Sequence, residues 1–248
     1  MNRTAWIVFA AVCIGIIGSL ILLSQGSSVD VSQVDQQQVQ KPNEQTGEIG
    51  DHVYGNKDAK IRIIEYGDYQ CPACSSAAPI IKQIAKKYLN NDVALIFRNF
   101  PLPSLHPNAR SASAAAEAAG LQDRYWEMHD KLYSSQSEWG QSSATQRVDF
   151  FVNYASMLGL DTERFKQDMT SAVVANKINY DVAVGKKVNI TGTPTVYIND
   201  KLIDQFVLDG KLVSEGTSGA QPIWSDQDAF EKLALEPAMR DAGITIKE

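Results

Sequence analysis

Two cysteines separated by two residues constrain the folding of this chain more than any other feature of its sequence. Cys71 and Cys74 lie between a short β-rich segment, residues 61–66, and a segment with apolar residues at helical spacing, residues 75–89. This order places Cys71 at a strand–turn–helix junction, with Pro72 at an early helical position that tolerates proline. Unpaired amides and the positive end of the helix dipole favour a thiolate at Cys71 and lower its pKa. Cys74, one turn inside the helix, is expected to be less exposed.

Three kinds of site could use such a cysteine pair. A structural zinc site needs two further ligands with suitable spacing, but the histidines, His52, His106 and His129, are scattered and no second CxxC occurs. A structural disulfide across so few residues constrains the unfolded chain very little. The third cysteine, Cys13, lies in an apolar segment near the N-terminus. A redox-active dithiol is therefore the favoured interpretation.

The N-terminal segment, residues 1–23, predicts a transmembrane signal-anchor. Its residues 5–23 carry no charge, and a helix of that length nearly spans a hydrocarbon core of ~30 Å. Arg3 is the only basic residue before Lys41, so the positive-inside bias predicts a cytoplasmic N-terminus and an exported remainder. The alternative is a cleaved signal peptide, whose apolar region is shorter, roughly 7–15 residues. Residues 24–50, rich in Gln, Ser, Asp and Val, are predicted to form a flexible polar linker.

The composition of the whole chain is that of an ordinary globular protein. Hydrophobic residues make up 44% of the chain, which is enough for a sizeable core. The net charge is −6, with 23 basic and 29 acidic residues. A nucleic acid is excluded as the main partner, because a phosphate-binding face needs a basic excess.

Four sequence stretches, in this order, resemble the DsbA-like thiol–disulfide oxidoreductases of the thioredoxin superfamily, in a membrane-anchored extracytoplasmic form. The stretches are EYGDYQCPAC (65–74), FRNFPLPSLHPNARSASAAAEAAG (97–120), YWEMHDKLY (125–133) and ITGTPTVYIND (190–200). The resemblance implies an α/β, thioredoxin-like fold over residues 51–248, with a helical insertion at about 107–187. It also implies that Pro72 and Ala73 form the active-site dipeptide between the catalytic Cys71 and Cys74.

The resemblance assigns roles to three further residues. Pro194, preceded by Thr193, matches a cis-proline that faces the active-site disulfide and leaves the backbone of Thr193 free to pair with a substrate strand. Glu65 matches an acidic residue that relays protons to the buried cysteine. In a strand Glu65 shares a face with core residues such as Ile63. The alternative is a solvated glutamate at the strand end, paired with a lysine.

These inferences predict an exported, membrane-anchored oxidase that transfers its Cys71–Cys74 disulfide to reduced exported proteins. By resemblance, a quinone-linked membrane protein of the DsbB or VKOR kind would reoxidise it. The chain is expected to act as a monomer, without a cofactor or metal. Two alternatives remain: a reductase or isomerase of the same fold, and a non-catalytic tethered module whose CxxC holds copper or zinc.

Further elements follow from local patterns. Residues 93–99 and 195–198 predict strands, and Asp209-Gly210 predicts the turn of a hairpin. Ser225 is expected to cap a last helix. Trp139, in a polar stretch, is either an exposed contact residue or, as is more typical of tryptophan, a core residue.

Overall fold

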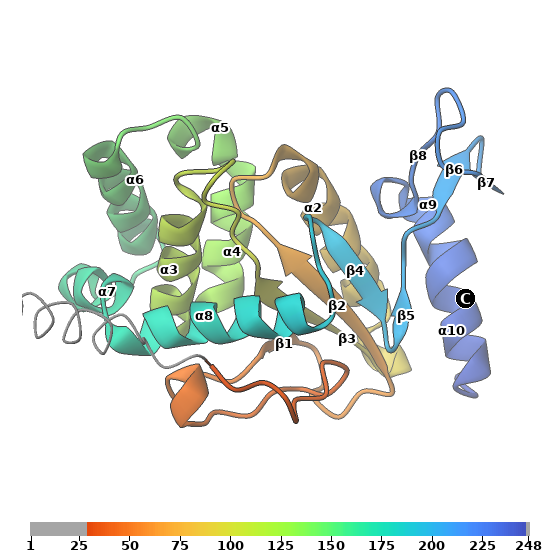
Figure 1. Cartoon of the computed structure of the whole chain (residues 1–248), viewed down its shortest axis with the longest axis horizontal. Helices are drawn as coiled ribbons and strands as arrows, with labels where there is room; N and C mark the ends of the chain where they lie inside the picture. Colours follow the sequence, from red (N-terminus) through yellow and green to blue (C-terminus); the bar gives the residue numbers. More distant parts are fainter. Residues whose placement is uncertain (1–28, 247–248) are drawn as a thin grey trace, which may run out of the picture. The chain divides into compact units, whose positions relative to one another are not determined.

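The structure of the chain is a computed structural model, which describes residues 29–246 (Figure 1). It divides into two compact units, residues 1–30 and 31–248, and the second unit is the subject below. The predicted membrane segment, residues 1–23, lies outside the described residues. Within residues 29–246, no helix is both long enough and apolar enough to cross a membrane.

A mixed five-stranded sheet forms the centre of the second unit. Its strands, in spatial order, are β1 (His52–Tyr54), β3 (Val93–Asn99), β2 (Ile61–Gly67), β4 (Thr195–Ile198) and β5 (Lys201–Leu202). The central strands β2 and β3 run parallel, whereas the other neighbours pair antiparallel. Both central strands are buried over almost their whole length, which explains their continuous apolar character. The strands predicted for residues 61–66, 93–99 and 195–198 are confirmed as β2, β3 and β4.

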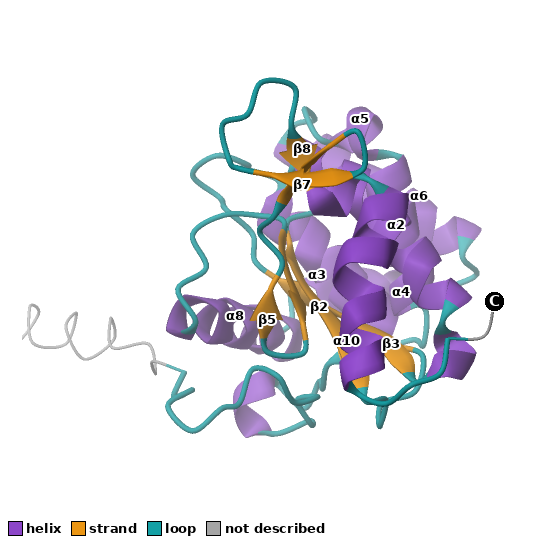
Figure 2. Ribbon diagram, turned by 90° about the vertical axis from the view of Figure 1, so that its right-hand side faces the viewer, coloured by secondary structure: helices purple, strands orange, loops and turns teal. Residues whose placement is uncertain are grey.

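Helices cover both faces of this sheet, and Figure 2 shows β2 and β5 between α8 on one side and α2 on the other. The helix α2 (Pro72–Lys87) packs on the face that carries Ile61 and Ile63. On the opposite face α8 comes close through Gly185, because a Cβ there would lie 2.7 Å from the ring of Phe100 and 3.3 Å from that of Tyr66. A larger residue at this position would push α8 away from the sheet.

The predicted helical insertion is present between β3 and β4. Its helices are α3 (Ala109–Gly120), α4 (Tyr125–Ser134), α5 (Gln136–Trp139), α6 (Ala144–Met157), α7 (Thr162–Met169) and α8 (Ala172–Lys187). The alanine-rich α3 is almost wholly buried, and its small side chains allow α4, α7 and α8 to pack closely around it. Trp139 is fully buried, where its Nε1 donates to the carbonyl of Leu132 at 2.9 Å. The interpretation of Trp139 as an exposed contact residue is therefore wrong.

The C-terminal region adds a small second sheet, in the order β7 (Lys211–Val213), β6 (Phe206–Leu208) and β8 (Gln221–Pro222). The predicted hairpin turn is confirmed, because Asp209 and Gly210 join β6 to β7 with φ values of 51° and 71°. The helical segments η3 (Ile223–Ser225), α9 (Gln227–Ala229), η4 (Phe230–Leu235) and α10 (Glu236–Asp241) follow. The cap of α9 is Asp226, not Ser225, because the Asp226 carboxylate accepts from the Ala229 amide.

The predicted linker differs from the structure in its described part, which packs against the domain. A short helical turn, η1 (Glu44–Thr46), is held by a capping box from Asn43, and Thr46 is buried. Arg98 donates hydrogen bonds to two backbone carbonyls of this segment, and Lys187 donates to two more. The segment itself has no regular apolar pattern that would predict this packing. Its partners are the side chains of Arg98 in β3 and Lys187 in α8, which lie far along the chain.

Candidate active site

The cysteine pair lies where β2 leads into α2. Cys71 is the N-cap of α2 and Cys74 lies in its first turn. The turn is held by backbone hydrogen bonds from Cys71 to the carbonyl of Asp68 at 3.0 Å and from Ser75 to the carbonyl of Cys71 at 3.1 Å. Both cysteines are free thiols, and Cys71 is 7% exposed whereas Cys74 is fully buried. Between them Pro72 occupies the first helical position and is exposed.

The two thiols have opposite acidities. The pKa of Cys71 falls to about 6, first because the Cys74 thiol donates a hydrogen bond to it, and further because of the backbone amides of Cys74 and Ala73. Burial opposes this change but does not cancel it. The pKa of Cys74 rises well above its ordinary value because burial removes water and the neighbouring Cys71 is negative. At neutral pH the reduced pair is therefore a Cys71 thiolate beside a protonated Cys74.

The loop before β4 brings Thr193 and Pro194 to this pair. The peptide bond between these two residues is cis, as the resemblance predicts. The Sγ atom of Cys71 lies 3.4 Å from the carbonyl oxygen of Thr193. The hydroxyl of Thr193 is buried, and the side chain of Thr193 contributes to the low pKa of Cys71. A groove of about 510 Å³ adjoins Pro194 and continues along β4 to the C-terminal sheet.

Glu65 lies on the face of β2 that α2 covers. It is fully buried, and neither carboxylate oxygen has a hydrogen-bond partner among the described residues. Burial, with a smaller contribution from the Cys71 thiolate, raises the pKa of Glu65 to about 8. The alternative of a solvated glutamate paired with a lysine is therefore wrong. A protonated carboxyl group at neutral pH, close enough to Cys74 to raise the pKa of that thiol, is chemically able to exchange a proton with it.

Two residues near the pair, Asp68 and Tyr133, were not singled out from the sequence. Asp68, buried in the loop before Cys71, accepts hydrogen bonds from the Leu102 amide and from Nδ1 of His106, both at 2.9 Å. The hydroxyl of Tyr133 is buried without a partner in the described part of the chain. No sequence pattern pointed to Tyr133; in the structure it lies next to Gly67, at the end of β2, where a Cβ would come within 2.9 Å of the tyrosine hydroxyl and closer still to the ring of Phe97.

The surroundings of the pair do not favour metal binding. Across residues 29–246, no group of three or more His, Cys, Asp or Glu side chains lies close enough together to hold a metal ion. The protonated Cys74 would also have to lose its proton before it could bind a metal.

Comparison with known proteins places this chain in a family. A family model described as Thioredoxin matches residues 47–211, about two thirds of the chain. The chain belongs to this thioredoxin family. The probable disulfide bond formation protein D of Bacillus anthracis is 26% identical over 191 residues, which cover 76% of this chain and 88% of that protein. BdbD from Bacillus subtilis, in its oxidised crystal structure, superposes with a TM-score of 0.61 at 24% identity, over 82% of this chain and 98% of BdbD.

A second group of relatives is much longer than this chain. The Na(+)/H(+) antiporter NhaA 1 of Salinispora arenicola is 36% identical over 151 residues, which are 61% of this chain but 22% of that protein. The chain therefore spans about a fifth of the length of this relative. The resemblance to the DsbA-like thiol–disulfide oxidoreductases is confirmed by the family model, the fold and the disulfide bond formation protein.

Proposed function

We propose that this chain is an extracytoplasmic thiol–disulfide oxidoreductase that introduces disulfides into exported proteins through Cys71 and Cys74. The opposite acidities of the two thiols carry this proposal. A Cys71 pKa of about 6 stabilises the reduced form of the pair, and a stabilised reduced form makes the corresponding disulfide a stronger oxidant. The buried Cys74 supplies the second sulfur without being open to attack by substrate.

The reaction begins with the Cys71–Cys74 disulfide. A substrate thiolate attacks Sγ of Cys71, the bond to Cys74 breaks, and Cys74 leaves as a thiolate that takes up a proton. A second substrate thiolate then attacks the substrate sulfur of the mixed disulfide. Cys71 leaves as a thiolate, and its low pKa makes it a good leaving group. The substrate has lost two electrons and the cysteine pair has gained them.

Three neighbouring residues assist these steps in our proposal. The backbone of Thr193, whose carbonyl oxygen lies beside Cys71, pairs with the substrate strand next to Pro194. Glu65 supplies and removes the proton of Cys74. Support for this last role is that the carboxyl group is unpaired, buried and has a pKa of about 8, close to the pH at which a proton carrier is most effective.

The cellular setting is also part of the proposal. Residues 1–23 anchor the chain in the membrane by a single span, and the catalytic domain lies on the extracytoplasmic side as a monomer. A quinone-linked membrane protein of the DsbB or VKOR kind reoxidises the pair. The uncharged residues 5–23 and the position of Arg3 support the orientation.

Equilibration of the full chain with glutathione tests the direction of the reaction. We expect a reduction potential clearly above that of thioredoxin, about −270 mV. A potential at or below that value would overturn the oxidase and favour the reductase. An assay of peptide oxidation, run beside metal analysis of the purified chain, separates both enzymes from a metal-binding module, because such a module would bind copper or zinc and catalyse no exchange.

A further inference from the structure

The loop that leads into the redox pair is bound by a side chain of the helical insertion. Gln136, the first residue of α5, donates through Nε2 to the carbonyl oxygen of Tyr69 at 2.8 Å and to that of Cys71 at 3.0 Å. A side-chain amide carries two N–H donors, so one group serves both carbonyls. The closer pair in sequence, Gln136 and Cys71, is 65 residues apart. The position of Cys71 therefore depends on a part of the fold outside the sheet and α2.

The other end of α5 holds the same loop. The carbonyl oxygen of Gly140 accepts from the side-chain Nε2 of Gln70 at 2.6 Å. The amide of Gly140 donates in turn to the carbonyl oxygen of Gln136 at 2.8 Å, which closes α5 into one tight turn. A Cβ at position 140 would lie only 2.7 Å from that carbonyl oxygen, so the turn needs glycine there. With Trp139 fully buried between these two residues, α5 is a clamp that binds the loop at both of its ends.

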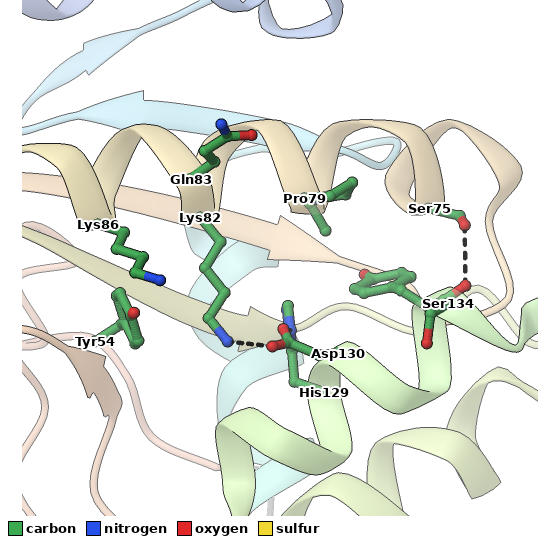
Figure 3. A pocket seen from close by; sticks show the side chains of 11 residues that line it. Tyr54, Ser75, Pro79, Lys82, Gln83, Lys86, His129, Asp130 and Ser134 are labelled. Carbon is green, nitrogen blue, oxygen red and sulfur yellow. Dashed lines mark hydrogen bonds and ion pairs between the residues drawn. The ribbon is translucent and has the colours of Figure 1, made fainter.

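The start of α2 has a second contact with the insertion. Ser75, in the first turn of α2, lines a pocket of about 610 Å³ between α2 and α4, where Figure 3 shows it. Its hydroxyl donates to the carbonyl oxygen of Tyr133 at 3.2 Å, and its amide donates to the carbonyl oxygen of Cys71 at 3.1 Å. The Cys71 carbonyl thus accepts from both Ser75 and Gln136, one hydrogen bond for each of its lone pairs. Two donors held by the insertion set the orientation of this carbonyl group.

The orientation of the Cys71 carbonyl affects the environment of its sulfur. Cys71 is the N-cap of α2, with φ −72° and ψ 123°. The next N–H groups along the chain are those of Ala73 and Cys74, because Pro72 has none. These two amides favour the Cys71 thiolate. A change of ψ at Cys71 would rotate its carbonyl and move the helix start, with both amides, relative to the sulfur.

We propose that Gln136 is a positioning residue for Cys71, because it holds the carbonyls of Tyr69 and Cys71 so that the sulfur faces the amides in the first turn of α2. The inference rests on the proposed function, since it takes Cys71 as the reacting sulfur, and it gives the helical insertion a part in the chemistry. The thiolate that Gln136 helps to stabilise is also the group that leaves when the mixed disulfide is resolved.

The test measures the fraction of Cys71 that is thiolate as a function of pH in the reduced full chain. The rate of alkylation by iodoacetamide reports this fraction, and mass spectrometry identifies the modified cysteine. Gln136→Met keeps the length of the side chain and removes both donors. Gln146→Met is the matched control, because Gln146 is exposed and its amide group binds Ser143 at the start of α6.

We expect Gln136→Met to lower the ratio of thiolate to thiol at Cys71 roughly 3-fold, the size typical of an interaction with the start of a helix. This change raises the midpoint of thiolate formation by about 0.5 pH unit. The equilibrium with glutathione should shift toward the protein disulfide by up to the same factor, because the reduced form is the one that loses stability. Gln146→Met should match the wild type in both measurements.

These readouts separate positioning from a purely structural role. A lower free energy of unfolding with an unchanged midpoint in Gln136→Met would overturn the inference, as would an equal shift in Gln146→Met. If Gln136→Met does not fold, Gln136→Ala, which leaves room for water at the two carbonyls, should raise the midpoint instead, and an unchanged midpoint there overturns the inference. A wild type that forms the thiolate but exchanges no disulfide would overturn the proposed function, whereas the titration would still decide the role of Gln136.

Discussion

Two sets of buried ionisable side chains in this domain are organised in opposite ways. The first set lies beside β3 and α8, where Arg98 pairs with Asp51 at 2.7 Å and Lys177 pairs with Asp181 at 2.6 Å. These four side chains are at most 1% exposed. The second set is the redox site, where Glu65 is equally buried but has no partner within the described residues. The two sets share burial and differ in pairing.

The presence or absence of a charged partner decides how the protonation of these buried side chains responds to pH. Although burial opposes it, the positive charges of Arg98 and Lys177 hold the pKa of Asp51 below its ordinary value, so this carboxylate stays ionised. At the redox site the pKa values are about 6 for Cys71 and about 8 for Glu65, on either side of neutrality. A buried carboxylate that two cations hold ionised, as Asp51 is, keeps its charge at working pH, whereas a buried acid without a partner can gain and lose its proton there. The redox site is therefore the set available for proton chemistry.

The largest effect is expected from the two cysteines. Cys71→Ser should abolish disulfide exchange, because it removes the sulfur that substrate attacks. Cys74→Ser should accumulate mixed disulfides with substrate proteins, since Cys71 remains but no internal thiol can release it. Non-reducing electrophoresis after incubation with a reduced substrate measures both. Equal trapping by the two variants would show that the nucleophile and the resolving cysteine are wrongly assigned.

The next largest effect is expected when one charged partner of the first set is removed. Lys177→Met leaves Asp181 buried beside no cation and should lower the free energy of unfolding by about 3–5 kcal/mol, measured by denaturant titration. Lys60→Met is the matched control, because the ion pair of Lys60 with Asp92 is exposed and long, at 3.9 Å; its loss should cost under about 1 kcal/mol. In both variants the thiolate of Cys71 should titrate as in the wild type. A shifted titration in Lys177→Met would show that the two sets are coupled.

A substitution of Glu65 in the redox site should instead raise the free energy of unfolding. The folded protein holds the proton of Glu65 up to about pH 8, whereas the ordinary value is 4.5. Between these values the folded state binds more protons than the unfolded state, so this group lowers the stability of the reduced protein as pH rises. The glutamine in Glu65→Gln has no proton to lose. The free energy of unfolding of this variant at pH 7 should therefore exceed that of the wild type by roughly 2–3 kcal/mol. Denaturant titrations of both reduced proteins from pH 5 to 8 measure the difference, and parallel curves would contradict the unpaired burial of Glu65.

The smallest effect concerns the link between the two thiols. The hydrogen bond from Cys74 is the main cause of the low Cys71 pKa. Cys74→Ala should therefore raise the midpoint of thiolate formation at Cys71 by about one pH unit, equivalent to about 1.4 kcal/mol. Titration of the ultraviolet absorbance of the thiolate measures the midpoint in the variant and the wild type. An unchanged midpoint would assign the low pKa to the amides at the start of α2 alone.

Local patterns predicted the elements that carry the site. The short apolar segments form β2, β3 and β4, and the cysteine pair lies at the start of α2. Both could be predicted, because a strand buried on both faces has a continuous apolar sequence and a helix start has characteristic residues. The described part of the polar segment before residue 51 was predicted as a linker and is instead packed. Its carbonyls are bound by Arg98 and Lys187, which lie far along the chain, so no local pattern could reveal those contacts.

The sequence by itself determined where the reactive sulfurs lie and which of the two is more exposed, since both follow from the position of Cys71 and Cys74 at the start of one helix. Only the tertiary structure decided that Glu65 has no partner within the described residues and that the hydroxyl of Tyr133 is buried near Gly67. Acidity depends on water and charge within a few ångströms. For Glu65 and Tyr133, that environment is assembled from β2, α2 and α4, which are separate in the sequence and meet only in the folded protein.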